Sequence, residues 1–589
     1  KDIKAGVTAA HATVDPKKGE LQSLELARGI LKNETISIKE PVMAEKKVTP
    51  SIPVSAVKSV KPAEIHMEKQ ISGDEDFEHF LKDRRDDVER VLREEYNRYR
   101  QAKVVEELKN FDFYTGPLAI TGVAIGLPGK SRKVFEDENF NAILRGENRI
   151  DALSDADRRH LVAKNITRVN KKADGSASFQ EIKSEDEVIQ LAGQLGYFDK
   201  SEYGIEFDND KGDSIAMAAG LEALRDAGIP LVPQYRKTST GGYLFSGYAL
   251  PEEMQDTTGV IRTSAFPGFN SIIEEVSRYT TYLNLTGPFS EFENIYYYVM
   301  ENIKDQEIKR QLTESFFKLK KTVSADKYIF GRGVPFKLGY IGGSQFAQLI
   351  KAKGPNTQTN AACSSFTQAV GIAEDWIRGG RCDRVIIIGS EVPDPESLGQ
   401  WLYALFLSLG AGTTKKNVFD AAKPFDAERN GTIVGGGGAS LIIERSDLVR
   451  KRGRAGQAEV LGTFIGNSAF HGTRLDVVHI SEIMKNAAEK VEKRHGLKKD
   501  DYARSLLFMS HETYTPAIGG SSTAEVSALK NTYPDHYKNI LITNTKGFTG
   551  HTLGAGIEDP VMVKSLQLGI APPIANLSKI PPEFSEWFD

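Results

Sequence analysis

The chain has 589 residues, of which 40% are hydrophobic and 26% are charged, and 76 basic against 80 acidic side chains give a net charge of −4. This balance argues against nucleic-acid binding, which favours a basic surface. No stretch approaches the roughly 18 uninterrupted apolar residues of a membrane span, and no apolar signal-peptide core follows the lysine-rich start. We therefore expect a cytoplasmic protein without a membrane span, and its first residue, Lys1, predicts a piece of a longer chain.

The cysteine content limits the chemistry further. Cys363 and Cys382 can form at most one disulfide and cannot supply a four-cysteine zinc site, so free thiols in a reducing compartment are expected. At about 150 residues per domain, the length corresponds to about four domains, or fewer if one is a large α/β enzyme.

The first part of the chain differs in pattern from the rest. Residues 1–73 show no sustained period, and their prolines cannot continue a helix, which predicts an interdomain linker. In residues 74–116, apolar side chains recur at three- and four-residue steps among dense charges, which predicts an amphipathic linker helix. We favour a helix packed on the next domain over a dimeric coiled coil, because fewer than three clean heptads are visible.

The globular body starts at residue 117. Apolar, β-branched runs predict buried strands, and helical patterns lie between several of them, which indicates an α/β class. The expected strands are residues 118–125, 242–245, 384–389, 440–444, 505–509 and 539–543, and the expected helices include 214–227, 364–378 and 481–493. The aromatic-rich stretch of about residues 251–332 predicts a helical insertion or an interface element.

Cys363 has the surroundings of a nucleophile. It stands in Thr-Asn-Ala-Ala-Cys-Ser-Ser-Phe, immediately before a predicted helix with Ser364 or Ser365 as its cap. A helix N-terminus stabilises a thiolate, so the position predicts a lowered thiol pKa. Cys382, in a turn before a strand, is expected to be a buried structural thiol.

Two of the ten histidines begin loops at predicted strand ends, where α/β sheets place functional groups. His511 follows the strand 505–509, and His551 follows the strand 539–543 in Asn-Thr-Lys-Gly-Phe-Thr-Gly-His-Thr-Leu-Gly-Ala-Gly. Lys546 precedes His551 by five residues in that stretch. These groups predict one site assembled from distant segments.

Two other interpretations of these residues are weaker. One cysteine with two histidines could form a zinc set, but no His-x₃-His or Cys-x₂-Cys spacing appears. The run Gly435-Gly-Gly-Gly438 lacks the Gly-Lys-Ser/Thr of a phosphate loop and precedes a strand, so close backbone packing is favoured.

From about Pro117 onward the chain resembles the β-ketoacyl synthase domains of multidomain polyketide and fatty-acid synthases. Four stretches in the family's order carry the resemblance: residues 360–365 (Asn-Ala-Ala-Cys-Ser-Ser), 424–431 (Pro-Phe-Asp-Ala-Glu-Arg-Asn-Gly), 511–516 (His-Glu-Thr-Tyr-Thr-Pro) and 546–555 (Lys-Gly-Phe-Thr-Gly-His-Thr-Leu-Gly-Ala). Together they are far more specific than any one alone.

The resemblance implies a fold as well as a domain division. We expect an α/β, thiolase-like fold in which two βα halves are stacked as helix, sheet, helix, sheet, helix. The domain would span residues 117–589, with the N-terminal half ending at about 455 and carrying the insertion, and the C-terminal half starting at about 456. The chain stops before the family's late Gly-Phe-Gly-rich loop, so we expect one oxyanion donor to be missing.

The activity implied is decarboxylative Claisen condensation in chain elongation. Cys363 would store an acyl group as a thioester, and His511 and His551 would stabilise the enolate formed from a malonyl-type extender. Lys546 would organise the charge near His551, with Glu525 as its ionic partner. Asn544 and Gly550 of the same stretch are expected to be supporting residues.

Four positions depart from the family's pattern. Glu512 and Tyr514 replace usual glycines, which predicts a different backbone near His511. Asn430 replaces a common Asp, and Gly436 replaces a common Glu, which affects loop anchoring and substrate range.

The implied partners are an acyl carrier protein bearing phosphopantetheine thioesters, a second copy in a homodimer, and neighbouring domains of the same synthase. No bound cofactor or metal is expected. Two alternatives remain open: a ketosynthase that only transfers acyl groups, and a dimerisation or carrier-docking scaffold. The acyl chain, the extender, the pathway and the role of the insertion are not determined by the sequence.

Overall fold

The computed structural model describes residues 93–99, 113–171, 176–325, 327–469, 475–516 and 520–587. The chain divides into two units, Lys1–Asn97 and Arg98–Asp589. The predicted linker of residues 1–73 lies outside the described residues, as does most of the predicted helix of residues 74–116, although its described part, residues 93–99, is helical and exposed. Among the described residues, no helix has the length and apolar character to cross a membrane.

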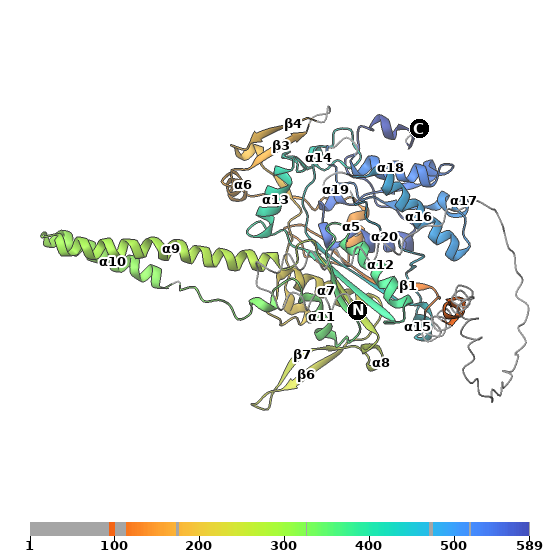
Figure 1. Cartoon of the computed structure of the whole chain (residues 1–589), viewed down its shortest axis with the longest axis horizontal. Coiled ribbons are helices and arrows are strands. Elements are labelled where there is room, and N and C mark those ends of the chain that lie inside the picture. Colours follow the sequence, from red (N-terminus) through yellow and green to blue (C-terminus); the bar gives the residue numbers. More distant parts are fainter. Residues whose placement is uncertain are drawn as a thin grey trace, which may run out of the picture. The chain divides into compact units, whose positions relative to one another are not determined.

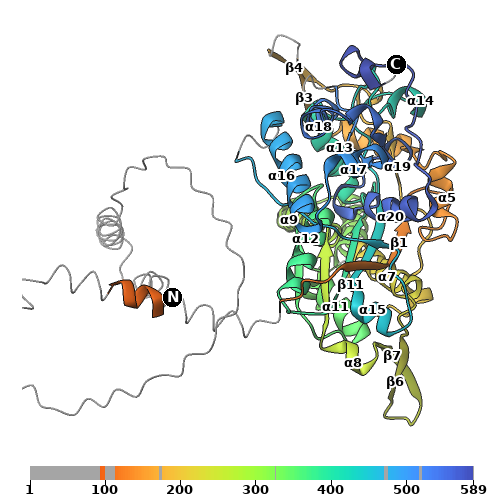
Figure 2. The same ribbon diagram turned by 90° about the vertical axis from the view of Figure 1, so that its right-hand side faces the viewer.

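The core of the second unit is a mixed six-stranded sheet in the order β12-β1-β11-β10-β8-β9. Figure 1 labels its strand β1, and Figure 2 labels the neighbouring strands β1 and β11. Its strands are β1 (Leu118–Gly126), β8 (Thr258–Thr263), β9 (Asn356–Thr359), β10 (Arg384–Glu391), β11 (Gly437–Arg445) and β12 (Ala458–Glu459). Strand β10 is parallel to β8 and antiparallel to β11, and β8 is parallel to β9. The predicted strands of residues 118–125, 384–389 and 440–444 are therefore confirmed.

Helices cover both faces of this sheet, which explains why its strands are apolar throughout. Along β10, Ile386 and Ile388 pack with α7 (Lys211–Asp226) on one face. Val385 and Ile387 point to the other face and pack with α12 (Ser365–Arg378). Because alternate residues of a strand face opposite sides, a continuous run of isoleucine and valine is what two covered faces require.

A smaller parallel pair, β13 (Leu507–Met509) and β14 (Leu541–Thr543), lies in the C-terminal half. Helices α16 (Val477–His495), α18 (Ser521–Thr532) and α20 (Glu558–Leu568) belong to the same half (Figure 2). Both strands end at segments that the sequence marks as functional, since β13 precedes His511 and β14 precedes Asn544. Their parallel pairing brings these two ends to the same edge.

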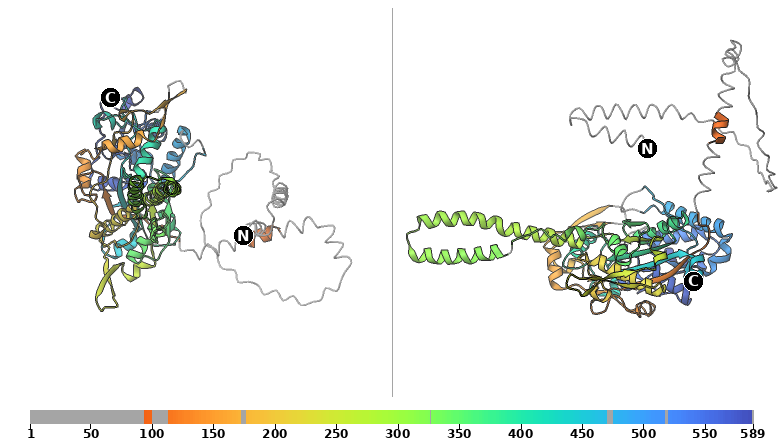
Figure 3. Two further views of the ribbon diagram at one scale, coloured as in Figure 1. Left: turned by 90° about the vertical axis from the view of Figure 1, so that its left-hand side faces the viewer. Right: turned by 90° about the horizontal axis from the view of Figure 1, so that it is seen from below.

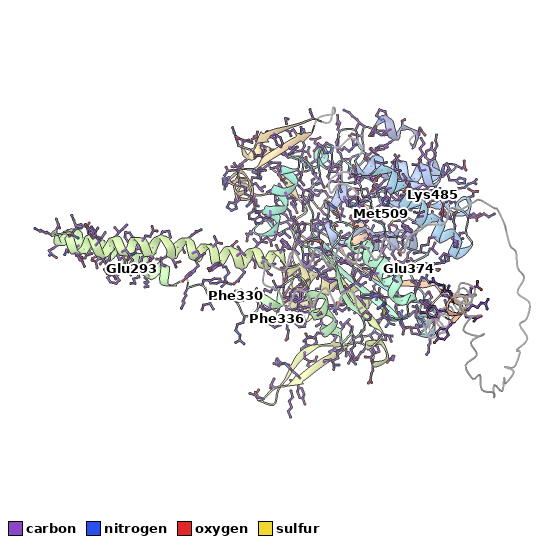
Figure 4. The ribbon with its side chains drawn as sticks, in the orientation of Figure 1. Glu293, Phe330, Phe336, Glu374, Lys485 and Met509 are labelled. Carbon is purple, nitrogen blue, oxygen red and sulfur yellow. The ribbon has the colours of Figure 1, made fainter. Side chains whose placement is uncertain are left out.

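A helical arm projects from the body of this unit (Figures 1 and 3). It consists of α9 (Phe269–Asn302) and α10 (Gln306–Ala325), whose contact is built from aromatic rings. The rings of Tyr296 and Phe316 stack at 3.9 Å between centroids. Glu293 (Figure 4) binds Lys320 across the two helices at 2.8 Å.

Two predictions about these elements were wrong. The insertion does not start near residue 251, because β8 within that range is a strand of the central sheet. Residues 242–245 do not form a buried strand. They lie at the exposed start of β7 (Tyr243–Ala249), which forms a hairpin with β6 (Val232–Lys237). Strand β12 pairs with β1 shortly after the predicted end of the first half at about residue 455, so the division of the halves stays a prediction.

The other elements are short and lie around these cores. The remaining strands are β2 (Asp151–Ala152), β3 (Thr167–Lys171), β4 (Ala177–Glu181) and β5 (Leu191–Ala192). The remaining α-helices are α5 (Asn139–Leu144), α6 (Asp155–Val162), α8 (Glu252–Gln255), α11 (Gly342–Ile350), α13 (Leu398–Ser408), α14 (Val418–Ala421), α15 (Ser446–Lys451), α17 (Lys499–Tyr502) and α19 (Lys546–Thr549). The 3₁₀ helices are η1 (Glu185–Glu187), η2 (Lys200–Tyr203), η3 (Val334–Phe336), η4 (Ala503–Ser505), η5 (Tyr537–Asn539), η6 (Leu553–Ala555) and η7 (Pro582–Trp587).

Candidate active site

A tight turn between β9 and α12 presents Cys363. Ala362 adopts a left-handed backbone conformation with φ of 48°, which is strained for a residue with a side chain. The hydroxyl of Ser365 supports the turn, since it accepts a hydrogen bond from the Ala361 N–H at 2.9 Å and donates one to the Ala362 carbonyl at 2.6 Å. Cys363 therefore stands one residue before the helix cap, Ser364, with its side chain half-buried.

The two histidines meet this thiol from the C-terminal half. The Nε2 atom of His551 lies 2.9 Å from the Sγ atom of Cys363. The rings of His511 and His551 are 5.3 Å apart between centroids and nearly perpendicular. His551 is buried, whereas His511 keeps exposed surface. The structure thus brings together Cys363, His511 and His551, which lie far apart in the sequence.

Close backbone packing holds His551 in place. Its N–H donates to the Ile433 carbonyl at 2.7 Å, and its carbonyl accepts from the Gly435 N–H at 2.9 Å. A Cβ atom at Gly435 would lie 2.2 Å from the Thr549 carbonyl oxygen, so no larger residue fits there. Gly550, with φ of 74°, makes the turn from α19 into His551. The glycine run therefore serves backbone contact, as the sequence indicated.

Lys546 forms a buried ion pair that the sequence did not predict correctly. Its Nζ atom lies 2.7 Å from a carboxylate oxygen of Glu558 at the start of α20. The predicted partner, Glu525, lies on α18 and points its carboxylate elsewhere. It accepts hydrogen bonds from the Ser510 hydroxyl and from the His511 N–H. Glu525 therefore positions the backbone of His511, and the expected Lys546–Glu525 pair is wrong.

Asn544 ties the two histidine-bearing loops together. Its amide nitrogen donates to the carbonyls of Ser510 at 3.3 Å and Glu512 at 2.9 Å. Its amide oxygen accepts from the Gly547 N–H at 3.4 Å, inside the Lys546 helix. One buried side chain thereby fixes the spacing between the His511 loop and the segment that leads to His551.

The unusual residues near His511 have defined places in the fold. Tyr514 occupies a left-handed conformation with φ of 46°, where glycine is easiest, and its ring is fully buried. Its hydroxyl donates to the Lys546 carbonyl and accepts from the Ile433 N–H, both at 3.4 Å. The Glu512 carboxylate accepts from the Ser522 N–H at the start of α18 at 2.7 Å. These contacts offset the strain of a side chain where glycine is usual.

The two other departures concern loops farther from the thiol. Asn430 accepts a hydrogen bond from the Thr413 hydroxyl and donates to the Asp420 carbonyl at 2.7 Å, so it anchors its loop as an amide. At Gly436, a Cβ atom would lie 2.8 Å from the Leu195 side chain. A glutamate could not be accommodated there without rearrangement of Leu195.

The resting thiol is protonated. Burial raises the pKa of Cys363 to about 11, which the Lys546 charge opposes and the carboxylates of Glu391 and Glu558 reinforce. The predicted lowering of this pKa at a helix N-terminus was therefore wrong, because desolvation and nearby acidic groups outweigh the helix dipole. The thiol needs a proton acceptor during attack, and His551 is in contact with it.

Both imidazoles are neutral. Burial and the Lys546 charge lower the pKa of His551 well below its usual value. The surrounding protein and the Lys546 charge also lower the pKa of His511, although part of its surface is exposed and the Glu558 carboxylate opposes the shift. Burial also opposes ionisation of Glu558, but the Lys546 ammonium outweighs it and lowers that carboxyl's pKa. Neutral imidazoles can donate N–H hydrogen bonds to a developing oxyanion or accept a proton.

The site does not have the features of a structural zinc centre. Among the described residues, the group of possible metal ligands is Cys363, His511 and His551, whose ligand atoms lie within 4.8 Å of one another. A structural zinc ion takes four protein ligands, and the lysine charge that lowers both histidine pKa values would also repel a cation. The geometry fits a nucleophile beside two hydrogen-bonding groups better than a metal site.

Comparisons with known proteins agree with this geometry. A model of the family described as Beta-ketoacyl synthase, N-terminal domain, matches residues 322–448. The 3-oxoacyl-[acyl-carrier-protein] synthase 2 of Coxiella burnetii is 30% identical over 230 residues, which cover 38% of this chain and 52% of the relative. The enzyme of the same name from Staphylococcus aureus is 30% identical over 233 residues, covering 38% and 53%. Residues 322–448 of the chain are thus similar to the N-terminal domain of β-ketoacyl synthases.

Solved structures identify the fold of the chain. A β-ketoacyl synthase from Burkholderia phymatum matches with a TM-score of 0.54 at 20% identity, covering 80% of this chain and 90% of that one. A type II polyketide ketosynthase, solved in complex with its acyl carrier protein, matches with a TM-score of 0.51 at 20% identity over the same shares. The predicted α/β, thiolase-like fold is thereby confirmed.

The sequence comparisons reach only part of the chain. The chain spans about half the length of the curated relatives it matches. The family match includes Cys363, whereas Lys546, His511 and His551 lie outside residues 322–448. The roles of these C-terminal residues therefore depend on the geometry described above.

Two acidic residues of the candidate site were not predicted from the sequence. Glu558 comes seven residues after His551, at the start of a helix. This closeness to the histidine motif could have identified it as a candidate site residue. Glu391 ends an apolar strand and is 2% exposed. An acidic residue at the end of an apolar strand could have identified Glu391 as a second candidate site residue.

Proposed function

We propose that the chain catalyses decarboxylative Claisen condensation as a chain-elongating β-ketoacyl synthase. The observation that carries the proposal is the 2.9 Å contact between Cys363 Sγ and His551 Nε2, with the His511 ring beside it. An acyltransferase of this kind needs a nucleophile to store the acyl group and separate donors to stabilise an enolate. The match of residues 322–448 to the β-ketoacyl synthase family model supports the same activity.

The first half-reaction loads Cys363. The thiol sulfur attacks the carbonyl carbon of an acyl thioester on a carrier, and its proton passes to His551 Nε2. Collapse of the tetrahedral intermediate breaks the carbon–sulfur bond of the donor. The departing pantetheine thiolate takes the proton back, so a free carrier thiol and an S-acyl cysteine are formed.

The second half-reaction uses both histidines as hydrogen-bond donors. Loss of CO₂ from a malonyl-type thioester leaves an enolate. Its oxygen is stabilised by an N–H group of His511 and by the Nε2–H of His551, which for this step is in the tautomer that carries its single proton on Nε2. The enolate carbon then attacks the S-acyl carbonyl and forms the new carbon–carbon bond. Cys363 leaves as a thiolate, which is reprotonated, and the β-ketoacyl product remains on the carrier.

Lys546, Glu525, Asn544 and Gly550 position this machinery in the proposed account. Burial and the Lys546 charge together keep both imidazoles neutral, and the position of Lys546 is set by Glu558. Glu525 and Asn544 fix the His511 loop, while Gly550 sets the backbone turn before His551. These residues act through the histidines and not on the substrate.

The proposed partners follow from the chemistry. Substrates are phosphopantetheine thioesters on an acyl carrier protein, as the carrier complex of one structural relative supports, and the reaction requires no bound cofactor. We also propose a homodimer in the cytoplasm, in line with reduced thiols. Strand β9 ends the central sheet without a further neighbour in the described part of the chain, and such an edge favours pairing with a second copy.

Intact-protein mass spectrometry tests the proposed function. The protein is incubated first with an acyl-loaded carrier and then with a malonyl-loaded carrier. We expect an acyl adduct on the protein, followed by its loss and the appearance of a β-ketoacyl carrier with release of CO₂. An adduct that forms but never condenses would contradict elongation and would favour a domain that only transfers acyl groups.

A further inference from the structure

The carboxylate of Glu512, the residue after His511, caps helix α18. Glu512 is 1% exposed, and its Oε2 atom accepts hydrogen bonds from the Ser521 hydroxyl at 2.6 Å and from the Ser522 N–H at 2.7 Å. Gly520, at the N-cap of α18, has no side chain to accept these bonds, and the first turn of the helix holds no acidic residue. Glu512 therefore supplies the acceptor and the negative charge that the start of a helix favours.

The capped helix sends a second carboxylate back to the residues beside Glu512. Glu525 stands one helical turn after Ser521, and its Oε1 atom accepts a hydrogen bond from the His511 N–H at 2.7 Å. Its Oε2 atom accepts from the Ser510 hydroxyl, which in turn accepts from the Glu512 N–H at 2.8 Å. Glu512 thus holds the start of the helix, and the helix holds the backbone of His511.

The backbone of His511 has to set the place of its ring. In the described part of the chain, the ring makes no hydrogen bond of its own, and its aromatic contact is with the ring of His551. The flanking residues are fixed, because Asn544 donates to the carbonyl of Glu512 at 2.9 Å. The N–H, the carbonyl and the carboxylate of Glu512 are all hydrogen-bonded, so the residue restricts the loop from both sides.

The rest of α18 is held independently of this cap. Leu529, farther along the helix, packs in an apolar cluster with Ala488 of α16 and Ile540. The backbone of Glu512 is not in the left-handed region that favours glycine, unlike that of Tyr514, so alanine fits at position 512. Loss of the Glu512 side chain should therefore loosen the first turn of α18 and leave the helix in place.

We propose that Glu512 is a positioning residue for His511, which caps α18 and thereby sets the Glu525 carboxylate that holds the His511 N–H. The inference rests on the proposed function, in which His511 stabilises the enolate. A glycine at position 512, which is usual in the resembling family, could not form this cap. The chain thus ties the histidine of one step to the start of a neighbouring helix.

Single-turnover measurements with a malonyl-loaded carrier test the proposal. Glu512→Ala is expected to slow CO₂ release about 10- to 100-fold, because a misplaced donor loses most of its effect, while acyl loading of Cys363 stays within about threefold of the parent. Glu512→Gln should retain CO₂ release within about threefold, since both hydrogen bonds reach one oxygen and an amide oxygen can accept both. Glu482→Ala, at an exposed position of α16, is the control and should leave both rates unchanged.

A double variant separates positioning from a general loss of structure. If Glu512 acts through His511, Glu512→Ala combined with His511→Ala should release CO₂ at the rate of His511→Ala alone. A further drop in the double variant would overturn the proposal. Equal losses of loading and CO₂ release in Glu512→Ala would overturn it as well.

Amide hydrogen exchange tests the same link without any substrate. Peptides that contain His511 should exchange about tenfold faster in Glu512→Ala than in the parent protein, with β10 unchanged. Unchanged exchange in the folded variant would overturn the proposal. Ser521→Ala, which removes one of the two donors, takes its place if Glu512→Ala does not fold by circular dichroism. A parent protein that releases no CO₂ would count against the proposed function, and the exchange result would then decide this inference by itself.

Discussion

The Nε2 atom of His551 lies 2.9 Å from the Sγ atom of Cys363, although 188 residues separate the two in the sequence. Burial makes the thiol hard to ionise and the imidazole hard to protonate, so the resting pair is neutral. A neutral pair in contact can exchange one proton during attack without either group carrying a charge at rest. This relationship distinguishes the roles of the two histidines.

Substitution of each histidine is expected to affect different half-reactions. His511→Ala should retain acyl loading within a few-fold and reduce decarboxylation by about 10²- to 10³-fold, because it removes an oxyanion donor. His551→Ala should slow both steps, because this residue also accepts the thiol proton. Single-turnover measurements of adduct formation and of CO₂ release separate the two effects. Equal losses in both steps for His511→Ala would contradict this division.

Lys546→Met is expected to destabilise the protein by about 3 to 5 kcal/mol, because it leaves the Glu558 carboxylate buried without its partner. The pKa of His551 should rise at the same time, since the lysine charge adds to the lowering caused by burial. Urea unfolding and NMR titration of the imidazole measure the two effects. Lys530→Met, in an exposed pair with Glu586, is the control and should cost less than about 1 kcal/mol.

The lowered pKa of Glu374 on α12 (Figure 4) predicts that the protein loses stability in acid. Burial opposes its ionisation, but hydrogen bonds from Thr463, Arg378 and Arg494 outweigh burial and lower its pKa from 4.5 to about 2. Because the folded pKa lies below the unfolded one, this stabilisation is present above about pH 4.5 and is lost as the pH falls toward 2.

Glu374→Gln should therefore be less stable than the parent protein by about 2 to 3 kcal/mol at pH 7, with the difference disappearing near pH 2. Urea unfolding as a function of pH measures this difference. Glu314→Gln, on an exposed face of the arm, is the control and should show no such convergence. A difference that stays constant between pH 7 and pH 3 would assign the effect to packing and not to charge.

The arm is expected to unfold independently when its aromatic contact is removed. Phe316 is 1% exposed and stacks on Tyr296, so Phe316→Ala should cost about 3 to 5 kcal/mol within the arm. Amide exchange in α10 should accelerate, while exchange in β10 stays unchanged. Phe317→Ala, at a neighbouring position with 58% exposure, is the control. Faster exchange in β10 would show that the arm and the central sheet unfold together.

The sequence predicted the central strands because β10 and β11 are apolar on both faces, which leaves a clear signal. It failed where a strand is exposed, as in β7, or short and flanked by helices, as in β8. Cys363, His511 and His551 could be selected because turns and strand ends mark them. The partner of Lys546 could not, since the choice between Glu525 and Glu558 depends on how α18 and α20 pack.

The pKa of Cys363 illustrates a second limit. Its place before a helix was visible in the sequence, and the local rule predicted a lowered value. The opposing groups, Glu391 and Glu558, come from a distant strand and a distant helix, and burial depends on the whole fold. The rule that a helix N-terminus lowers a thiol pKa therefore predicted the wrong direction for the pKa shift of Cys363.

The most direct test of the account is the location of the acyl group after loading. The protein is incubated with an acyl-loaded carrier alone, and the modified peptide is identified by mass spectrometry. We expect a single adduct on Cys363 and none on Cys382, with no adduct in Cys363→Ala. An acyl group that still forms on the protein in Cys363→Ala, at the rate of the parent protein, would contradict the central claim.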